Sequence, residues 1–277
     1  MKTNFHTHTT FCDGKNTPEE MVCSAITKKF DMLGFSAHSM QPFDSSWHLR
    51  SERLGEYTDE IFRLKEKYAE KIKILHGFEA DYIPGITLPT FEKYAEFKPD
   101  FLIGSIHYIY NNIETFAVDN TPQELENGIK TVFNGSVRNA VHEYFSLQKE
   151  MLERGDFSII GHPDLIRKFN GRLNFLDENE TWYKDELKSL AEKIKSAGVI
   201  AEINTGGISR GYMTNPYPSE YFLTLLFDLC VPITISSDAH HESQLDGSFD
   251  LALSLAKKVG YTELAIPLKN KFDFYKI

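Results

Sequence analysis

Short apolar segments alternate with longer amphipathic segments along almost the whole chain. The apolar segments are rich in Ile, Leu, Val and Phe, a composition typical of strands that are buried on both faces of a parallel sheet. The intervals between them are more polar, and several carry apolar residues at helical spacing. Seven strands are predicted in this way, at residues 3–5, 32–37, 72–78, 101–106, 157–160, 199–203 and 232–235.

Two of the polar intervals open with the same helix-start signal. Thr17 and Thr121 each stand immediately before a proline and three residues before a glutamate. This pattern predicts a threonine N-cap, a proline at the first helical position and a glutamate placed for a capping box. Gly198 is placed to end another helix as a C-cap. The predicted helices start near residues 18 and 122 and elsewhere span 52–71, 178–197, 218–229 and 248–259.

The alternation of strand and helix predicts an α/β fold in which crossover helices join parallel strands. Seven strands favour a barrel related to the eightfold β/α barrel but one unit short, and an open doubly wound sheet is the alternative. The longest interval without a predicted strand, about 110–156, is expected to form a loop and two helices that cover one mouth of the barrel. Because no linker or internal repeat divides the sequence, we expect a single domain over residues 1–277.

The composition excludes some classes of partner. Of the 277 residues, 41% are hydrophobic and 25% charged, and the formal net charge is −10. Binding to nucleic acid or an anionic membrane needs clustered Lys and Arg, so neither partner is expected. The N-terminus lacks the apolar run of a signal peptide, and the three cysteines form no CxxC pair. We therefore expect a cytoplasmic protein, and the sequence leaves its oligomeric state open.

Residues that can bind metal ions follow six of the seven predicted strands. Active sites of parallel barrels lie at the carboxyl ends of the strands, so these side chains are expected to converge on one face. Any one of them could be structural, but six such placements at the same end of successive strands point to a shared site. They are His6, His8, Asp13, His38, Glu79, Asp81, His107, His162, Asp164, Asp238 and His240.

Mixed imidazole and carboxylate ligands suit Zn²⁺, Mn²⁺ or Fe²⁺, and the absence of thiolates argues against a purely structural zinc site. About five such ligands would satisfy two metals that share a carboxylate, and a larger set favours a third. Four histidines lie outside this pattern. We expect His48 and His142 at the surface, His76 in the core, and His241 facing solvent or supporting the site from behind.

These residues resemble the motifs of the polymerase and histidinol phosphatase (PHP) family. The resemblance covers almost the whole chain: four family motifs match, and two further ligand positions fall between them. It implies a distorted seven-stranded β/α barrel with a trinuclear metal centre. The matching motifs are His6-Thr7-His8, His38, Gly161-His162-Pro163-Asp164 and Ser237-Asp238-Ala239-His240, with Glu79 and His107 at the intervening positions.

The same resemblance implies which residues would hold each metal. Some family members have a histidine where this chain has Asp13, a change that could alter the metal preference of one site. The implied sets are His6, His8, Glu79 and Asp238 for the first metal, Glu79 as a bridge with His107 and His162 for the second, and Asp13, His38 and His240 for the third.

Within the family, residues 202–211 and 215–219 resemble the stand-alone L-histidinol-phosphate phosphatases of histidine biosynthesis. This implies hydrolysis of a small phosphomonoester by a metal-bridged hydroxide, whose formation at neutral pH the metals make possible. Arg210 and, second, Arg167 are expected to bind the phosphate, because arginine forks match phosphate oxygens. Asp13 is the candidate for proton transfer to the leaving group. Glu114, with Asp119 nearby, is the candidate for the cationic end of the substrate.

Three alternatives remain at this level. The substrate could be another small phosphomonoester, or the protein could be a phosphodiesterase or 3′-exonuclease, which the acidic net charge disfavours. A non-catalytic accessory domain with a decayed site is the third, and the apparently complete ligand set argues against it.

Overall fold

The structure is a computed structural model that describes residues 1–41, 43, 45–110, 115–269 and 271–277. Its centre is a seven-stranded sheet in which every neighbouring pair of strands is parallel. The strands, in their order across the sheet, are β1 (Thr3–Asn4), β2 (Met32–His38), β3 (Lys73–Asp81), β4 (Phe101–Ser105), β7 (Ile159–Ile160), β8 (Ile200–Asn204) and β9 (Ile233–Ser236). All seven predicted strands are confirmed.

The first and last strands meet just beyond their carboxyl ends. Thr7 and Ala239 form a parallel bridge, in which the His8 amide donates to the Ala239 carbonyl at 2.9 Å and the Ala239 amide donates to the His6 carbonyl at 3.2 Å. This contact makes the sheet a nearly closed barrel and excludes the open doubly wound alternative.

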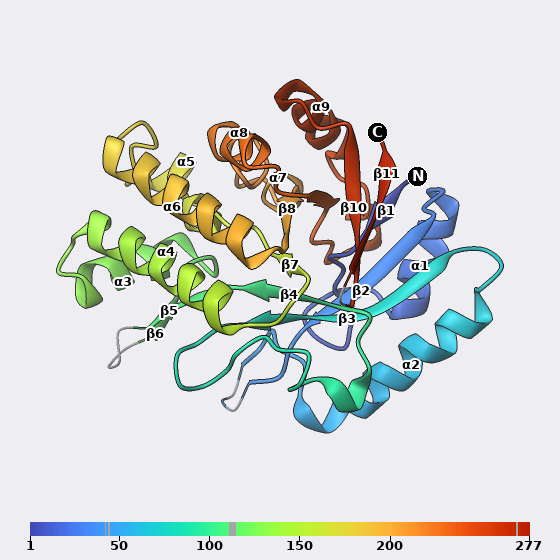
Figure 1. Cartoon of the computed structure of the whole chain (residues 1–277). Coiled ribbons are helices and arrows are strands. Elements are labelled where there is room, and N and C mark those ends of the chain that lie inside the picture. The colour runs from blue at the N-terminus through green and yellow to red at the C-terminus, as the bar shows by residue number, and fades with distance from the viewer. Residues whose placement is uncertain (42, 44, 111–114, 270) are drawn as a thin grey trace.

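Helices lie along the outside of the barrel between successive strands (Figure 1). The Thr17 hydroxyl accepts from the Glu20 amide, and the Glu20 carboxylate accepts from the Thr17 amide, so the capping box predicted there is confirmed. The Thr121 hydroxyl accepts from the Glu124 amide, but the Glu124 carboxylate accepts from the Ala117 amide and closes no second box. Gly198 ends its helix in the left-handed conformation, as predicted. The long helices are α1 (Pro18–Thr27), α2 (Leu54–Lys67), α3 (Pro122–Val132), α4 (Val137–Arg154), α6 (Thr181–Ala197), α8 (Glu220–Asp228) and α9 (Phe249–Val259).

The region from 110 to 156 differs in part from its prediction. The two helices are present as α3 and α4, but the region also contains β6 (Thr115–Ala117), which pairs antiparallel with β5 (Tyr108–Tyr110). Strands of three residues are too short to show an alternating pattern, which is why they escape sequence reasoning. α4 lies alongside α6 on the outside of the barrel rather than over its mouth (Figure 1).

A second hairpin, absent from the prediction, covers the barrel at the amino ends of its strands. It consists of β10 (Glu263–Leu268) and β11 (Lys271–Lys276). Ala265 and Ile266 of β10 join an apolar cluster inside the barrel whose other buried members are Phe5, Leu75, Phe101, Ile103, Ile159 and Ile200. The amino-terminal half of the barrel interior is thus filled by hydrocarbon.

Among the described residues, no helix has both the length and the apolar character needed to cross a lipid bilayer.

Candidate metal centre

The carboxyl ends of the strands bring the predicted ligands together at one mouth of the barrel. His38 and Glu79 belong to β2 and β3, and the other seven stand on the loops that follow β1, β4, β7 and β9. The described residues form four overlapping groups, and within each group the ligand atoms all lie within 4.8 Å of one another. They are His8, Asp13, His38 and His240; His6, His8 and Asp238; His6, Glu79 and His162; and His38, Glu79 and His107.

The four ligands predicted for the first metal lie close together, with His6, His8 and Asp238 in one group. His6 Nε2 lies 3.0 Å from Glu79 Oε2 and 3.7 Å from Asp238 Oδ1. His8 Nε2 lies 3.5 Å from Glu79 Oε2 and 3.3 Å from Asp238 Oδ1. A zinc ion bonds such atoms at about 2.0–2.2 Å, so the ligands of a tetrahedral site stand roughly 3.3–3.6 Å apart. The spacing of His6, His8 and Asp238 is near these values, and Glu79 Oε2 approaches the two histidines from its own side.

Glu79 is placed to bridge the first set to the second. Its Oε2 faces His6 and His8, whereas its Oε1 lies 2.9 Å from His162 Nε2 and 3.4 Å from His107 Nε2. Ser105 Oγ donates to the same Oε1 at 2.7 Å and so fixes the carboxylate. The two oxygens of one side chain thus face two different ligand groups.

The third set gathers around Asp13. His240 Nε2 lies 3.1 Å from Asp13 Oδ2, and His38 Nε2 lies 3.8 Å from Asp13 Oδ1. His38 also turns its Nδ1 toward Glu79 Oε2 at 3.0 Å. The His38 ring therefore lies between Asp13 and Glu79. The His8 ring stacks on the His240 ring, with the ring centres 4.1 Å apart.

Several of these ligand atoms are buried polar groups with no hydrogen-bond partner among the described residues. They include His6 Nε2, His8 Nε2, Asp13 Oδ1 and Glu79 Oε2. An unsatisfied buried donor or acceptor is costly, so native proteins rarely leave several side by side. Divalent cations at these positions would satisfy all four atoms, and the donor set suits zinc, manganese or iron.

The close packing of acids and imidazoles shifts the pKa values of both. Burial alone would lower the pKa of His38, but Glu79 and Asp13 raise it to about 9. Burial would also lower the pKa of His107, but Asp81 and Glu79 raise it to about 10. For the Glu79 carboxyl group burial acts in the opposite direction and would raise the pKa, yet the surrounding histidines hold it well below its usual range. The carboxylates therefore stay ionised, and protons on the histidines balance their charge where cations would otherwise do so.

Asp81 supports a ligand from behind instead of joining the four groups. Its Oδ1 accepts from His107 Nδ1 at 2.6 Å, and its Oδ2 accepts from His48 Nε2 at 2.9 Å. His48 is buried and also contacts Ser45, so the prediction that it lies at the surface is wrong. A carboxylate in this position fixes the ring orientation and tautomer of a metal-binding histidine.

Glu202 plays the corresponding part for His6. Glu202 lies in the segment 202–211 but is not among the predicted site residues. Its Oε1 accepts from His6 Nδ1 at 2.7 Å, and its Oε2 accepts from the His162 backbone amide at 2.9 Å. Its signal was a glutamate inside a strand, β8, that is otherwise apolar and buried on both faces, where a carboxylate needs a partner.

Arg210 reaches the metal centre. Its Nη2 donates to Asp238 Oδ2 at 2.7 Å, and its Nη1 donates to the Asp238 carbonyl at 2.9 Å. Its Nε is buried without a partner among the described residues. The guanidinium therefore stands beside a predicted metal ligand.

Arg167 is held more firmly within the protein. It is buried, with its Nη1 donating to Asp164 and the Pro216 carbonyl and its Nε donating to Glu178. These bonds make it the weaker of the two phosphate-binding candidates. Glu114 lies outside the described residues.

The other histidines follow their predictions. His76 is buried among aromatic rings, whereas His142 and His241 are exposed.

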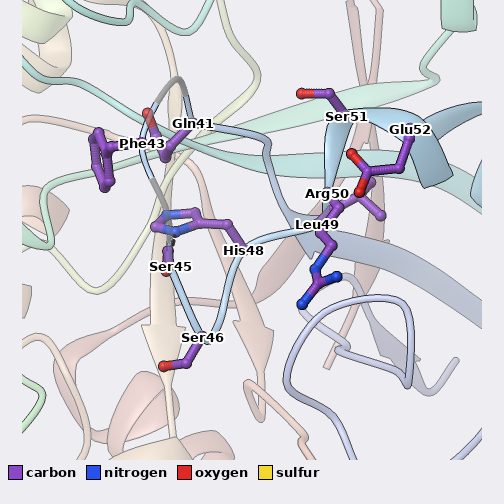
Figure 2. Close-up of a pocket in the computed structure, with 9 residues that line it drawn as sticks. All are labelled: Gln41, Phe43, Ser45, Ser46, His48, Leu49, Arg50, Ser51 and Glu52. Atoms are coloured by element: carbon purple, nitrogen blue, oxygen red, sulfur yellow. Dashed lines mark hydrogen bonds between the residues drawn. The ribbon is translucent and has the colours of Figure 1, made fainter.

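A separate pocket of about 940 Å³ opens beside the loop that follows β2 (Figure 2). Its lining includes Phe43, Ser45, His48 and Glu52. Among the described residues that line this pocket, none is one of the nine predicted metal ligands. His48 links this pocket to the metal centre through Asp81. The half-buried ring of Trp47 lies 5.9 Å from the rings of both His38 and His107 and donates from Nε1 to the Tyr108 hydroxyl.

A parallel β/α barrel with histidines and carboxylates gathered at the carboxyl ends of its strands defines a metal-binding barrel protein. The particular family follows from comparison: the PHP domain matches residues 4–206, well over half of the chain, so the protein belongs to the PHP family.

Named relatives are similar over nearly their full lengths. A probable histidinol-phosphatase of Schizosaccharomyces pombe is 27% identical, covering 96% of this chain and 89% of the relative. The histidinol-phosphatase of Lactococcus lactis is also 27% identical, covering 98% and 96%. A crystal structure of the L. lactis histidinol phosphate phosphatase, in complex with zinc, L-histidinol and phosphate, aligns with a TM-score of 0.74 and 23% identity over 98% of both chains. That likeness confirms the barrel fold.

Proposed function

We propose that this protein is a histidinol-phosphatase, which hydrolyses L-histidinol phosphate to L-histidinol and inorganic phosphate with divalent cations bound at the barrel mouth. The observation that carries the proposal is the meeting of nine ligand residues at that mouth, with four of their buried polar atoms left without partners among the described residues. The substrate assignment is supported by the names of the relatives and by the ligands of the L. lactis structure.

The proposal includes three metal sites, one for each of the three ligand sets that the family resemblance implies; the four overlapping groups of ligand atoms support it. His6, His8 and Asp238 would hold the first cation with Glu79 Oε2, and His107 and His162 would hold the second with Glu79 Oε1. The third would lie among Asp13, His38 and His240. Bound divalent cations supply a nucleophile from water at neutral pH and neutralise the phosphoryl oxygens.

The protein's own residues orient the substrate and manage its protons. Arg210, fixed by two hydrogen bonds to Asp238, presents its Nε edge to a phosphoryl oxygen. Burial would raise the pKa of Asp13, but His38 and His240 lower it, so its carboxylate carries no proton at neutral pH. Asp13 therefore acts on the leaving alkoxide by orienting a water molecule as the proton donor.

The test is phosphate release from L-histidinol phosphate against a panel of sugar, nucleotide and serine phosphates, with the metal content measured by mass spectrometry. We expect about three metal ions per chain and a clear preference for L-histidinol phosphate. Comparable rates across the panel would leave a phosphatase of broader or different specificity, and activity confined to diesters would favour the exonuclease alternative.

The role of Arg210 has its own test. Arg210→Ala should lower kcat/KM by about ten- to a hundredfold, because a charge-assisted hydrogen bond is worth about 1.5–3 kcal/mol. Arg63→Ala, which removes an exposed arginine paired with Glu19 and Glu60, is the control. If the Arg210→Ala variant keeps both its metal content and its kinetic constants, the role of Arg210 in phosphate binding is rejected.

A further inference from the structure

Asp119 stands between the loops that carry two of the metal ligands. The pairing of β5 with β6 and the bond from the Val118 amide to the His107 carbonyl, 2.9 Å, hold residue 119 close to the loop after β4. On its other side it contacts Lys168, which follows His162 by six residues on the loop after β7. Two separate loops thus fix the position of one carboxylate at the barrel mouth.

Lys168 occupies only part of the hydrogen-bonding capacity of Asp119. Its Nζ donates to the Asp119 carbonyl at 2.7 Å and to Oδ2 at 3.1 Å. Lys168 itself is buried, with its ammonium 5.2 Å from the centre of the Tyr212 ring. The lysine is therefore held in place and in turn fixes the rotamer of the aspartate.

The other carboxylate oxygen, Asp119 Oδ1, is buried and has no partner among the described residues. An ionised carboxylate has several lone pairs to satisfy, and leaving one oxygen unpaired in a buried position is costly. Although burial raises the pKa of Asp119, Lys168, His107 and His162 lower it, so the group is an anion. A fixed anion with a free oxygen beside a predicted phosphate site is suited to receive a cationic group of the substrate.

We infer that Asp119 Oδ1 binds the ammonium group of the substrate and thereby selects amino-alcohol phosphates over other phosphomonoesters. The inference rests on the proposed function, since it takes the phosphate to be held at the metal centre. In L-histidinol phosphate the amino group is separated from the ester oxygen by only two carbons. The ammonium of a phosphate ester held near His107 and His162 therefore stays close to these residues, and the bond from the Val118 amide to the His107 carbonyl keeps Asp119 on the adjoining segment. An alternative is that the Lys168–Asp119 pair only ties the two loops together.

The experiment compares Asp119→Asn with the wild type on three substrates: L-histidinol phosphate, its deamino analogue 3-(imidazol-4-yl)propyl phosphate, and p-nitrophenyl phosphate. Asparagine keeps the size of the side chain and removes its charge. We expect the variant to lose about ten- to a hundredfold in kcat/KM on L-histidinol phosphate, the worth of a hydrogen bond between charged groups. The two substrates without an ammonium should change less than about threefold, so the preference for the amino substrate disappears.

Binding provides a second readout. Calorimetric titration with L-histidinol should show weaker binding by the variant, and titration with the deamino alcohol should show none of this difference. Asp246→Asn is the matched control, because Asp246 also pairs with lysines, Lys2 and Lys28, but contacts no predicted metal ligand among the described residues. It should leave the substrate preference unchanged.

The outcomes separate the inference from the function on which it rests. A wild type that does not prefer L-histidinol phosphate to p-nitrophenyl phosphate would refute the proposed function. A wild-type preference that survives in Asp119→Asn, or an equal loss on all three substrates, would overturn the inference alone and leave Asp119 a structural tie. If Asp119→Asn does not fold, Asp119→Glu keeps the charge and displaces its oxygens. An unchanged preference in that variant would again overturn the inference.

Discussion

The two ends of the barrel are built from the same strands and have opposite chemistry. At the amino end, Phe5, Phe101 and Ile103 lie in a wholly apolar cluster that β10 covers. At the carboxyl end, His6, only one residue after Phe5, begins a cluster of imidazoles and carboxylates. Both halves are buried, but one is satisfied by its own packing and the other leaves ligand atoms without partners among the described residues.

This difference separates stability from function along the barrel axis. The apolar end gains free energy from burial and needs nothing from outside the chain. The polar end brings acids and imidazoles out of water, which costs free energy unless cations or protons compensate. We therefore expect changes at the amino end to affect unfolding and changes at the mouth to affect metal binding and catalysis.

Metal removal should produce the largest difference between the two ends. A chelator is expected to abolish phosphatase activity, because the nucleophile and the neutralisation of phosphate both depend on the cations. It should also lower the Tm by about 10 °C, since a ligand bound only by the folded state at a thousand times its Kd adds about 4 kcal/mol. Activity assays and calorimetry before and after dialysis, followed by re-addition of zinc or manganese, measure both effects. Full activity after complete removal of metal would contradict the site.

Phe101→Ala should be the largest stability change at the amino end. The ring is fully buried and lies against the backbone of two neighbouring strands, where a Cβ added to Gly77 would stand 2.7 Å from Phe101 Cε1. Truncation of a buried phenylalanine costs about 3–5 kcal/mol. Denaturant unfolding should show this loss, while metal content and kcat at low temperature stay near those of the wild type. A variant that keeps its stability but loses metal would reverse the division between the two ends.

Glu202→Gln should have a smaller effect, confined to the mouth. Glutamine keeps the shape of the side chain, but it is a poorer acceptor for His6 Nδ1 than the carboxylate that now bonds it at 2.7 Å. Loss of a carboxylate that orients a metal-binding histidine typically costs about ten- to a hundredfold in metal affinity or activity. Metal titration with a competing chelator measures the change. Glu186→Gln is the control, because Glu186 pairs with the exposed His142 and contacts no predicted metal ligand among the described residues.

The same division explains what could be predicted from the sequence. The strands and the meeting of the nine candidate ligands at one mouth were predictable, because buried parallel strands are short apolar runs and their carboxyl ends meet. His48 was not, because its burial depends on a loop that folds back until the ring meets Asp81. The hairpin of β10 and β11 was missed because it follows the last helix, where the alternation of strand and helix ends. Residues whose role depends on a contact across the barrel, such as Glu202 with His6, are recognisable only once the fold is known.

The smallest expected effect is the loss of stability on removing the ion pairs of Asp246. This carboxylate pairs with Lys2 and Lys28 beside the start of β1. Burial alone would raise the pKa of Asp246, but the two lysines lower it. A carboxylate with a depressed pKa contributes stability above its unfolded-state pKa of about 3.9 and loses that contribution as the pH falls further. All three side chains are partly exposed, so Asp246→Asn should cost less than about 1 kcal/mol at pH 7. The difference in Tm between variant and wild type, measured at pH 7 and near pH 3, should shrink toward zero at the lower pH. A difference that stays constant, or one as large as that of Phe101→Ala, would show that partly exposed charges stabilise this protein as strongly as its apolar end.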